Sequence, residues 1–161
     1  MVCAGCPARA GVRAVIGSWL RALFRNPRRD RPEAHRAGAW GEETAARWLE
    51  RKGYRILGRN VRFGSRCELD LVARSPAPDA LVFVEVKTRR SERFGRPMAA
   101  VDRAKRRALG RAAHQYLRRL KVRPPRIRFD VVEVVGTPGG EPPVVRHIEN
   151  AFSPGPGYRV P

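Results

Sequence analysis

Acidic side chains interrupt two apolar segments of this chain that have the composition of buried strands. Asp70 lies within the apolar segment 67–73, and Glu85 lies within the apolar segment 81–88. Runs of branched and aromatic residues separated by a Pro-rich loop are typical of neighbouring strands. A buried charge is unfavourable unless it is paired or binds a metal. The two segments therefore predict a functional site within the sheet.

Strand periodicity predicts which neighbouring residues share this site with the two acids. Side chains two positions apart lie on the same face of a strand. On this basis one face of the first strand holds Glu68 and Asp70, followed by Val72. One face of the second strand holds Glu85 and Lys87. The four ionisable residues among these five form the candidate site.

The remaining segments predict an α/β fold with a mixed central sheet and helices packed on it. Amphipathic helices are expected at about 38–52 and 99–120, and strands at 54–63, 67–73, 81–88, 127–135 and 144–148. The linker 74–80 is short, so the second and third strands are expected to form an antiparallel hairpin. The predicted order is α-β-β-β-α-β-β, with the last strand at an edge of the sheet.

Both predicted helices carry a charged residue on the side expected to face the sheet. Glu42 lies on the same helical stripe as Ala45 and Leu49. Its position leaves two explanations open: a carboxylate directed into the site, or a first-turn glutamate that stabilises the helix dipole. In the second helix, Lys105 falls on the side of Val101 and is expected to point toward the site.

The length of 161 residues suits one domain with extensions at its ends. We expect a basic N-terminal extension at 1–37, flexible or forming an amphipathic helix, a folded domain at 38–152, and a C-terminal tail at 153–161. Lys and Arg number 34 against 15 acidic residues, which gives a net charge of +19. This excess favours a polyanionic partner, with nucleic acid first. An Arg-rich composition from a high-GC genome is the alternative.

Basic residues are concentrated between positions 101 and 128, where eleven Lys or Arg accompany one acid. A Lys or Arg that neutralises a phosphate releases counterions, so binding through this surface is expected to be strong and salt-dependent. The alternative is a solvated helix face without a ligand. The candidate nucleic-acid-binding residues are Arg89, Arg103, Lys105, Arg106 and Arg107.

Several other classes of protein are disfavoured by composition. Three cysteines provide no disulfide framework and fit a reducing cytoplasm. No apolar run reaches the roughly 20 residues that a membrane-spanning helix needs. The three histidines lack the spacing of a metal site or a catalytic triad, and no Gly-rich phosphate loop is present. We therefore expect a cytoplasmic protein whose chemistry depends on its acids and lysines.

These residue types suit metal-assisted hydrolysis of a phosphodiester. Mg²⁺ is usually bound by one or two carboxylates, with water and substrate phosphate completing its coordination. Asp70 and Glu85, on neighbouring strands, are the residues expected to supply the carboxylates. Lys87 lies on the face of Glu85, where it can activate or orient the attacking water or stabilise charge on phosphorus. A structural Glu85–Lys87 ion pair, with Asp70 in a turn, is the alternative.

Short motifs are spread along the chain at 38–42, 53–54, 68–73, 83–89, 94–95, 128–132 and 147–152, together with Asn60 and Lys105. With these motifs the chain resembles the PD-(D/E)xK, or restriction-endonuclease-like, nuclease superfamily. More narrowly it resembles the YraN-type bacterial family, which is similar to Holliday-junction resolvases. The resemblance covers about 38–152. In the motif of the second strand, Cys67 stands where a glycine is usual, which predicts crowding at the start of that strand.

The resemblance implies a restriction-endonuclease-like core and an endonuclease that uses Mg²⁺ or Mn²⁺ to hydrolyse DNA, including branched DNA. It assigns metal binding to Asp70, Glu85 and Glu42 and assistance of the nucleophile to Lys87. Glu68 and Lys105 are the second choices for site residues. A homodimer is expected by analogy, because a four-way junction has two-fold symmetry.

Two other functions stay open. A non-catalytic nucleic-acid-binding protein can retain the nuclease fold, since a fold does not fix a function. A module that binds a protein partner through the segment 12–24 is the third possibility.

Overall fold

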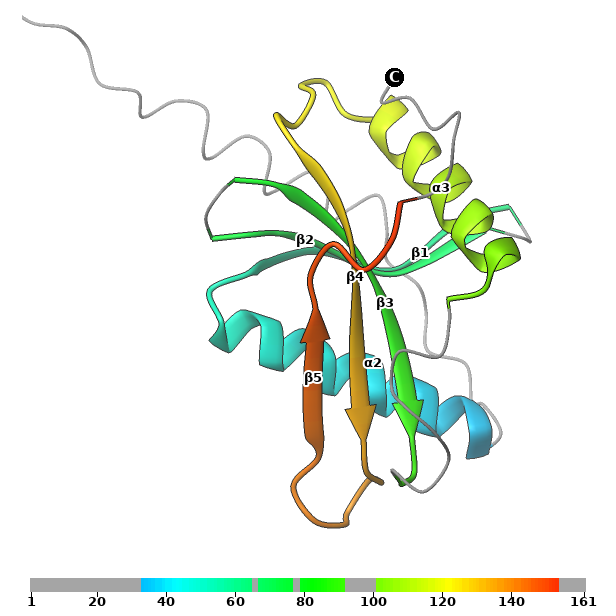
Figure 1. Ribbon diagram of the computed structural model, residues 1–161, viewed down its shortest axis with the longest axis vertical. Helices are drawn as coiled ribbons and strands as arrows, with labels where there is room; N and C mark the ends of the chain where they lie inside the picture. Colours follow the sequence, from blue (N-terminus) through cyan, green and yellow to red (C-terminus); the bar gives the residue numbers. More distant parts are fainter. Residues whose placement is uncertain (1–32, 65–66, 77–78, 92–100, 154–161) are drawn as a thin grey trace, which may run out of the picture.

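The computed structural model describes residues 33–64, 67–76, 79–91 and 101–153, which form one five-stranded sheet flanked by two helices (Figure 1). The order of the strands across the sheet is β1-β2-β3-β4-β5. The elements are α2 (Glu33–Arg51), β1 (Arg55–Phe63), β2 (Cys67–Arg74), β3 (Leu81–Arg89), α3 (Arg103–Arg118), β4 (Ile127–Val135) and β5 (Val144–Ile148). This succession confirms the predicted α-β-β-β-α-β-β order.

The sheet is mixed because one connection crosses from strand to strand over its face. β1 pairs antiparallel with β2, β2 with β3, and β4 with β5, whereas β3 and β4 run parallel. Parallel neighbours require a long crossover connection, and α3 lies within it. The predicted hairpin of β2 and β3 and the edge position of β5 are both confirmed.

Each helix covers one face of the sheet through a stripe of small and apolar residues. The α2-side cluster joins α2 to β2, β3 and β4, and it includes Ala45, Ala46, Leu49, Leu71, Val84 and Val132. The α3-side cluster joins α3 to β1, β2, β3 and β4, and it includes Leu69, Val72, Phe83, Leu109, Tyr116 and Phe129. Burial of these apolar side chains is the main force that fixes both helices on the sheet.

The first helix begins earlier than predicted, at Glu33 instead of about 38. Residues 33–37 of the predicted extension are therefore part of α2. Pro32 directly precedes this start in the sequence, and a proline followed by an acidic residue favours a helix N-terminus. The rest of the extension, with its expected amphipathic segment, and the tail after residue 153 lie outside the described residues.

The second helix begins later than predicted, at Arg103 instead of about 99. Asp102 has an extended backbone, and its Oδ1 accepts the N–H of Lys105 at 2.7 Å. An aspartate in this geometry caps a helix and sets its first turn. The cap therefore fixes where Lys105 leaves the helix.

Cys67 does not crowd the start of β2, contrary to the prediction. Cys67 is buried in the α3-side cluster and pairs in regular register with Phe63, so its side chain fills core space instead of crowding the strand. None of the described helices is long and apolar enough to cross a membrane.

Candidate active site

The candidate site lies where β2 and β3 stop pairing. The register of the two strands runs from Arg74 opposite Leu81 to Leu71 opposite Val84. Beyond this last pair, Oδ2 of Asp70 accepts the backbone N–H of Val86 at 2.8 Å. A side-chain carboxylate thus takes the place of a strand carbonyl, which orients Asp70 toward β3.

The strict alternation predicted for residues 68–72 is wrong at this point. Leu69 and Val72 both belong to the α3-side cluster, whereas Leu71 belongs to the α2-side cluster. Side chains three positions apart share a face only where a strand is irregular, and the register of β1 against β2 shifts nearby, between Ile56 and Gly58. The change of face therefore falls between Leu69 and Val72, next to the point where β2 and β3 stop pairing.

Glu85 is the buried centre of the site, with 2% of its surface exposed. Lys87 Nζ lies 2.9 Å from Glu85 Oε1, and Lys105 Nζ lies 3.0 Å from Glu85 Oε2. The two lysines come from different elements, β3 and α3. The prediction that Lys105 points toward the site is therefore confirmed, and one buried carboxylate holds two ammonium groups.

Burial and charge change the protonation of this cluster. Burial raises the pKa of Asp70 to about 7, and the nearby Glu85 carboxylate adds to the rise, while the N–H of Val86 opposes it. Burial alone lowers the pKa of Lys105, but its attraction to Glu85 and Asp70 outweighs burial and raises this pKa above its usual value. Lys105 is therefore charged at neutral pH, whereas Asp70 titrates close to neutrality.

Glu42 approaches the site from α2. Its Oε2 accepts a hydrogen bond from Asn60 Nδ2 at 2.6 Å, and its charge contributes to the raised pKa of Asp70. Asn60 has a φ of 51°, a left-handed conformation that asparagine tolerates better than most residues. Because α2 begins at Glu33, Glu42 lies well inside the helix and is not the first-turn glutamate of the alternative explanation.

The other predicted residues lie around this centre. Glu68 forms an ion pair with Arg62 at 2.9 Å and adds to the raised pKa of Lys105. Arg103 and Arg107 are exposed on α3. Arg106 is also exposed, but its Nε donates to the Val101 carbonyl at 2.7 Å and its guanidinium lies over the ring of Phe152. Arg89 lies apart from them, at the end of β3, where it pairs with Glu133 at 3.1 Å.

The donor set fits a hard cation such as Mg²⁺ or Mn²⁺ with outside ligands. Across the described ranges, no three His, Cys, Asp or Glu side chains are grouped so that they could hold a metal by themselves. Asp70 and Glu85 offer two carboxylates, the number that Mg²⁺ commonly takes from protein. Glu85 Oε2 is buried and lies 3.0 Å from Lys105 Nζ. A carboxylate oxygen has two lone pairs, so Oε2 can bind a cation in addition to this lysine.

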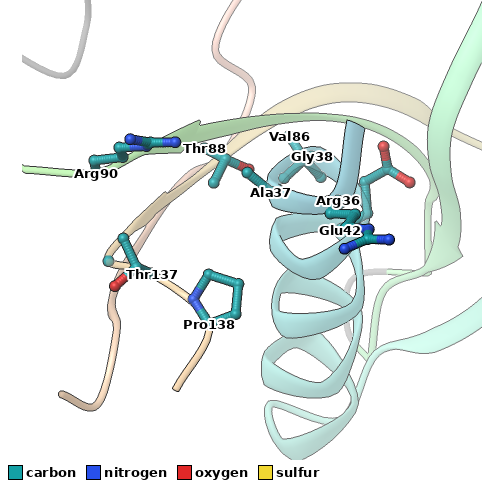
Figure 2. Close-up of a pocket in the computed structure, with 10 residues that line it drawn as sticks. Arg36, Ala37, Gly38, Glu42, Val86, Thr88, Arg90, Thr137 and Pro138 are labelled. Atoms are coloured by element: carbon teal, nitrogen blue, oxygen red, sulfur yellow. The ribbon is translucent and has the colours of Figure 1, made fainter. Parts of the chain in front are cut away.

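A pocket of about 820 Å³ opens next to Glu42 (Figure 2). Thr88 and Arg90, at the end of β3, lie on one side of it, and Arg36 and Glu42 of α2 lie on the other. The helix and the strand are in close contact beside it, since a Cβ on Gly41 would lie 1.8 Å from Thr88 Oγ1. Sequence reasoning missed this pocket, because it depends on where α2 crosses β3.

Comparisons with known proteins identify the family of this chain. The model of the family described as Uncharacterised protein family UPF0102 matches residues 41–134. A UPF0102 protein of Symbiobacterium thermophilum is 52% identical over 119 residues, covering 74% of this chain and 98% of the relative. A UPF0102 protein of Pelobacter propionicus is 44% identical over 122 residues, covering 76% and 86%. The predicted YraN-type membership is confirmed, and the chain belongs to the uncharacterised protein family UPF0102.

Proposed function

We propose that this protein is a metal-dependent phosphodiesterase that cleaves nucleic acid, with DNA as its substrate. The observation that supports this most strongly is the convergence of Lys87 and Lys105 on buried Glu85, beside a second carboxylate, Asp70. One cation is enough to neutralise a buried carboxylate, but Glu85 has two lysines. Asp70 beside it has a pKa of about 7 and is only partly charged near neutral pH, so the lysines keep positive charge for an anionic substrate.

Asp70 and Glu85 are the residues that would hold the metal ion, with Glu42 nearby in α2. A bound Mg²⁺ or Mn²⁺ supplies polarisation of a phosphate oxygen and of the attacking water. Glu42 accepts from Asn60 and acts on Asp70 through its charge, so its expected role is less direct than that of the other two acids.

The lysines account for the part of the reaction that the chain itself carries out. In hydrolysis the water oxygen bonds to phosphorus, the bond to the leaving sugar oxygen breaks, and that oxygen takes up a proton. Negative charge on the phosphoryl oxygens must be stabilised during this change. Lys87 and Lys105 are held within 3.0 Å of Glu85, so their positive charges are in place before the substrate binds. The net charge of +19 adds long-range attraction for the polyanion.

Cleavage of labelled DNA tests this function directly. Duplex, single-stranded and four-way-junction DNA are incubated with Mg²⁺, Mn²⁺ or EDTA and with wild type, Glu85→Gln or Arg51→Gln. Arg51→Gln is the matched control, because Arg51 is exposed at the end of α2, outside the candidate site. We expect metal-dependent product from wild type and Arg51→Gln and at least a 100-fold lower rate from Glu85→Gln, on the order of 3 kcal/mol.

Two results would contradict the proposal. If folded Glu85→Gln cleaves DNA as fast as the wild type, Glu85 takes no part in the reaction. Binding of all three DNAs without product under either metal would favour the non-catalytic nucleic-acid-binding function. Circular dichroism of each variant checks that a loss of activity is not a loss of fold.

A further inference from the structure

A row of charged residues crosses three strands beyond the candidate active site. The register places Lys87 of β3 beside Glu133 of β4, and Glu133 beside Arg146 of β5. Arg89, two residues after Lys87, lies on the same face of β3. Neighbouring strands are about 4.8 Å apart, so Lys87 and Arg146 are separated by about 10 Å across the sheet. We call these four residues the Glu133 row.

Glu133 holds the two arginines of this row through its two different oxygens. Arg89 Nε lies 3.1 Å from Oε1, and Arg146 Nη1 lies 3.3 Å from Oε2. Glu133 is 1% exposed, whereas the side chains of Arg89 and Arg146 are 30% and 39% exposed. The carboxylate is thus beneath the surface, and both arginine side chains are partly exposed to solvent.

This arrangement exceeds what neutralisation of a buried acid requires. One arginine suffices to neutralise Glu133, yet the carboxylate contacts two. A free arginine side chain loses rotamer entropy when it is fixed. Glu133 fixes both arginines before any ligand arrives, which lowers the cost of binding an anion there.

The row is continuous with the candidate site and extends beyond α3. Lys87 belongs to both, since its Nζ also contacts Glu85 at 2.9 Å. α3 covers the β1 and β2 part of this face, while the ends of β3 and β4 continue away from the helix (Figure 1). The face that leads from Glu85 along β3 to Arg89 therefore carries a series of cations next to the acids.

We infer that Arg89 and Arg146, positioned by Glu133, bind backbone phosphates next to the phosphate that is cleaved. A single nucleic-acid strand then follows β3 from Glu85 toward Arg89. The guanidinium group suits this role, because its planar set of donors matches phosphate oxygens. Contacts of this kind read the backbone and not the bases, so the strand is bound without sequence preference. This inference rests on the proposed function for the place of the cleaved phosphate.

Salt-dependent binding tests the two arginines. The affinity of the full chain for a labelled single-stranded DNA is measured by fluorescence anisotropy in EDTA, which prevents metal-dependent cleavage. Arg146→Gln should weaken binding about 3–10-fold and reduce the slope of log affinity against log salt by about 0.7, the value for one lost phosphate contact on a single strand. Arg51→Gln removes the same charge from the opposite side of the sheet and should leave the slope unchanged. Equal slopes for both variants would overturn the inference.

Glu133→Gln tests whether Glu133 acts only as a negative charge or positions the two arginines. The two explanations predict changes in DNA affinity of opposite sign. If Glu133 is only a negative charge near a polyanion site, its removal strengthens DNA binding. If it positions Arg89 and Arg146, its removal weakens binding although the chain becomes more positive. Weaker binding by the folded variant, with a shallower salt slope, is the expected result, and tighter binding would overturn the inference.

The outcomes also separate this inference from the proposed function. If the wild type cleaves DNA but Arg146→Gln and Glu133→Gln keep the wild-type salt slope, the phosphate contacts are wrong and the nuclease function stands. If both variants have reduced slopes but the wild type cleaves no DNA, the phosphate contacts stand and the catalytic role of Glu85 is wrong.

Discussion

At the scale of single residues, the pKa of Asp70 is far from that of an ordinary surface acid. Burial and the neighbouring Glu85 raise its pKa to about 7, from an ordinary value of 3.8. A carboxyl group with a raised pKa binds its proton more tightly in the folded state than in the unfolded state. Its contribution to stability is therefore fully present below pH 3.8 and is lost as the pH rises through 7.

The variant Asp70→Asn should therefore change how stability depends on pH. The amide removes the charge but keeps an oxygen that can accept the N–H of Val86. The free energy of unfolding of wild type should fall relative to the variant between pH 4 and pH 8, by about 2–4 kcal/mol in total. Thermal unfolding followed by circular dichroism in EDTA measures this difference. Parallel profiles of the two proteins would show that Asp70 keeps an ordinary pKa.

At the scale of elements, the contact of α2 with β3 decides where Glu42 lies. Gly41 precedes Glu42, and its backbone lies against the Thr88 side chain more closely than a Cβ at position 41 would permit. The sequence contains glycines at both 38 and 41 in this helix, but only the second is in such a contact. A glycine inside a helix costs about 1 kcal/mol relative to alanine, and at position 41 the close packing offsets this cost.

Alanine at positions 38 and 41 should change the stability of the protein in opposite directions. Gly41→Ala places a Cβ against the Thr88 hydroxyl and should destabilise the fold by about 1–3 kcal/mol. Gly38→Ala meets no atom within 4 Å and should stabilise α2 by about 0.5–1 kcal/mol. Urea unfolding measures both changes. In the double variant Gly41→Ala/Thr88→Ala part of the lost stability should return, and an unchanged loss would mean that Thr88 is not the obstacle.

At the scale of the whole molecule, a buried polar network joins segments that are far apart in the chain. Asp130 of β4 is completely buried. Its carboxylate accepts from Arg128 at 2.9 Å and from the N–H of Asn150 at 2.9 Å, and it contacts His147 Nε2 at 2.8 Å. Arg128 also donates to the hydroxyl of Tyr54, just after α2. The network therefore connects β4 with β5 and with the residue Tyr54 that follows α2.

Removal of the centre of this network should be among the most destabilising changes in the chain. Asp130→Ala removes the completely buried acceptor shared by Arg128, His147 and Asn150 and leaves Arg128 its ion pair with Glu149, so we expect a loss of about 3 kcal/mol. Asp130→Asn keeps an acceptor for Asn150 and should cost less. The midpoint of urea unfolding distinguishes the two. A loss below 1 kcal/mol for Asp130→Ala would show that the network is not needed for stability.

Local patterns predicted most of the fold because they report local structure. Periodicity in the sequence located every described strand and both helices, and it singled out Asp70, Glu85, Lys87 and Lys105. The change of face between Leu69 and Val72 was missed, because it depends on where two strands separate. No sequence pattern singled out Glu133, since its partners Arg89 and Arg146 are supplied by the register with β3 and β5. Such lateral neighbours are set by long-range pairing and leave no local pattern.

The parallel pairing of β3 with β4 also determines the order in which the site can be assembled. Asp70 and Glu85 lie in an antiparallel hairpin whose contacts are close in sequence, and such contacts form quickly. Lys105 arrives only with the crossover helix, and Glu133 and Arg146 arrive after it. A chain that emerges from the ribosome N-terminus first thus makes its two acids and Lys87 together, before Lys105 has been made. Lys87 offsets part of the like-charge repulsion in this nascent hairpin, and the second cation is supplied only by the second half of the protein.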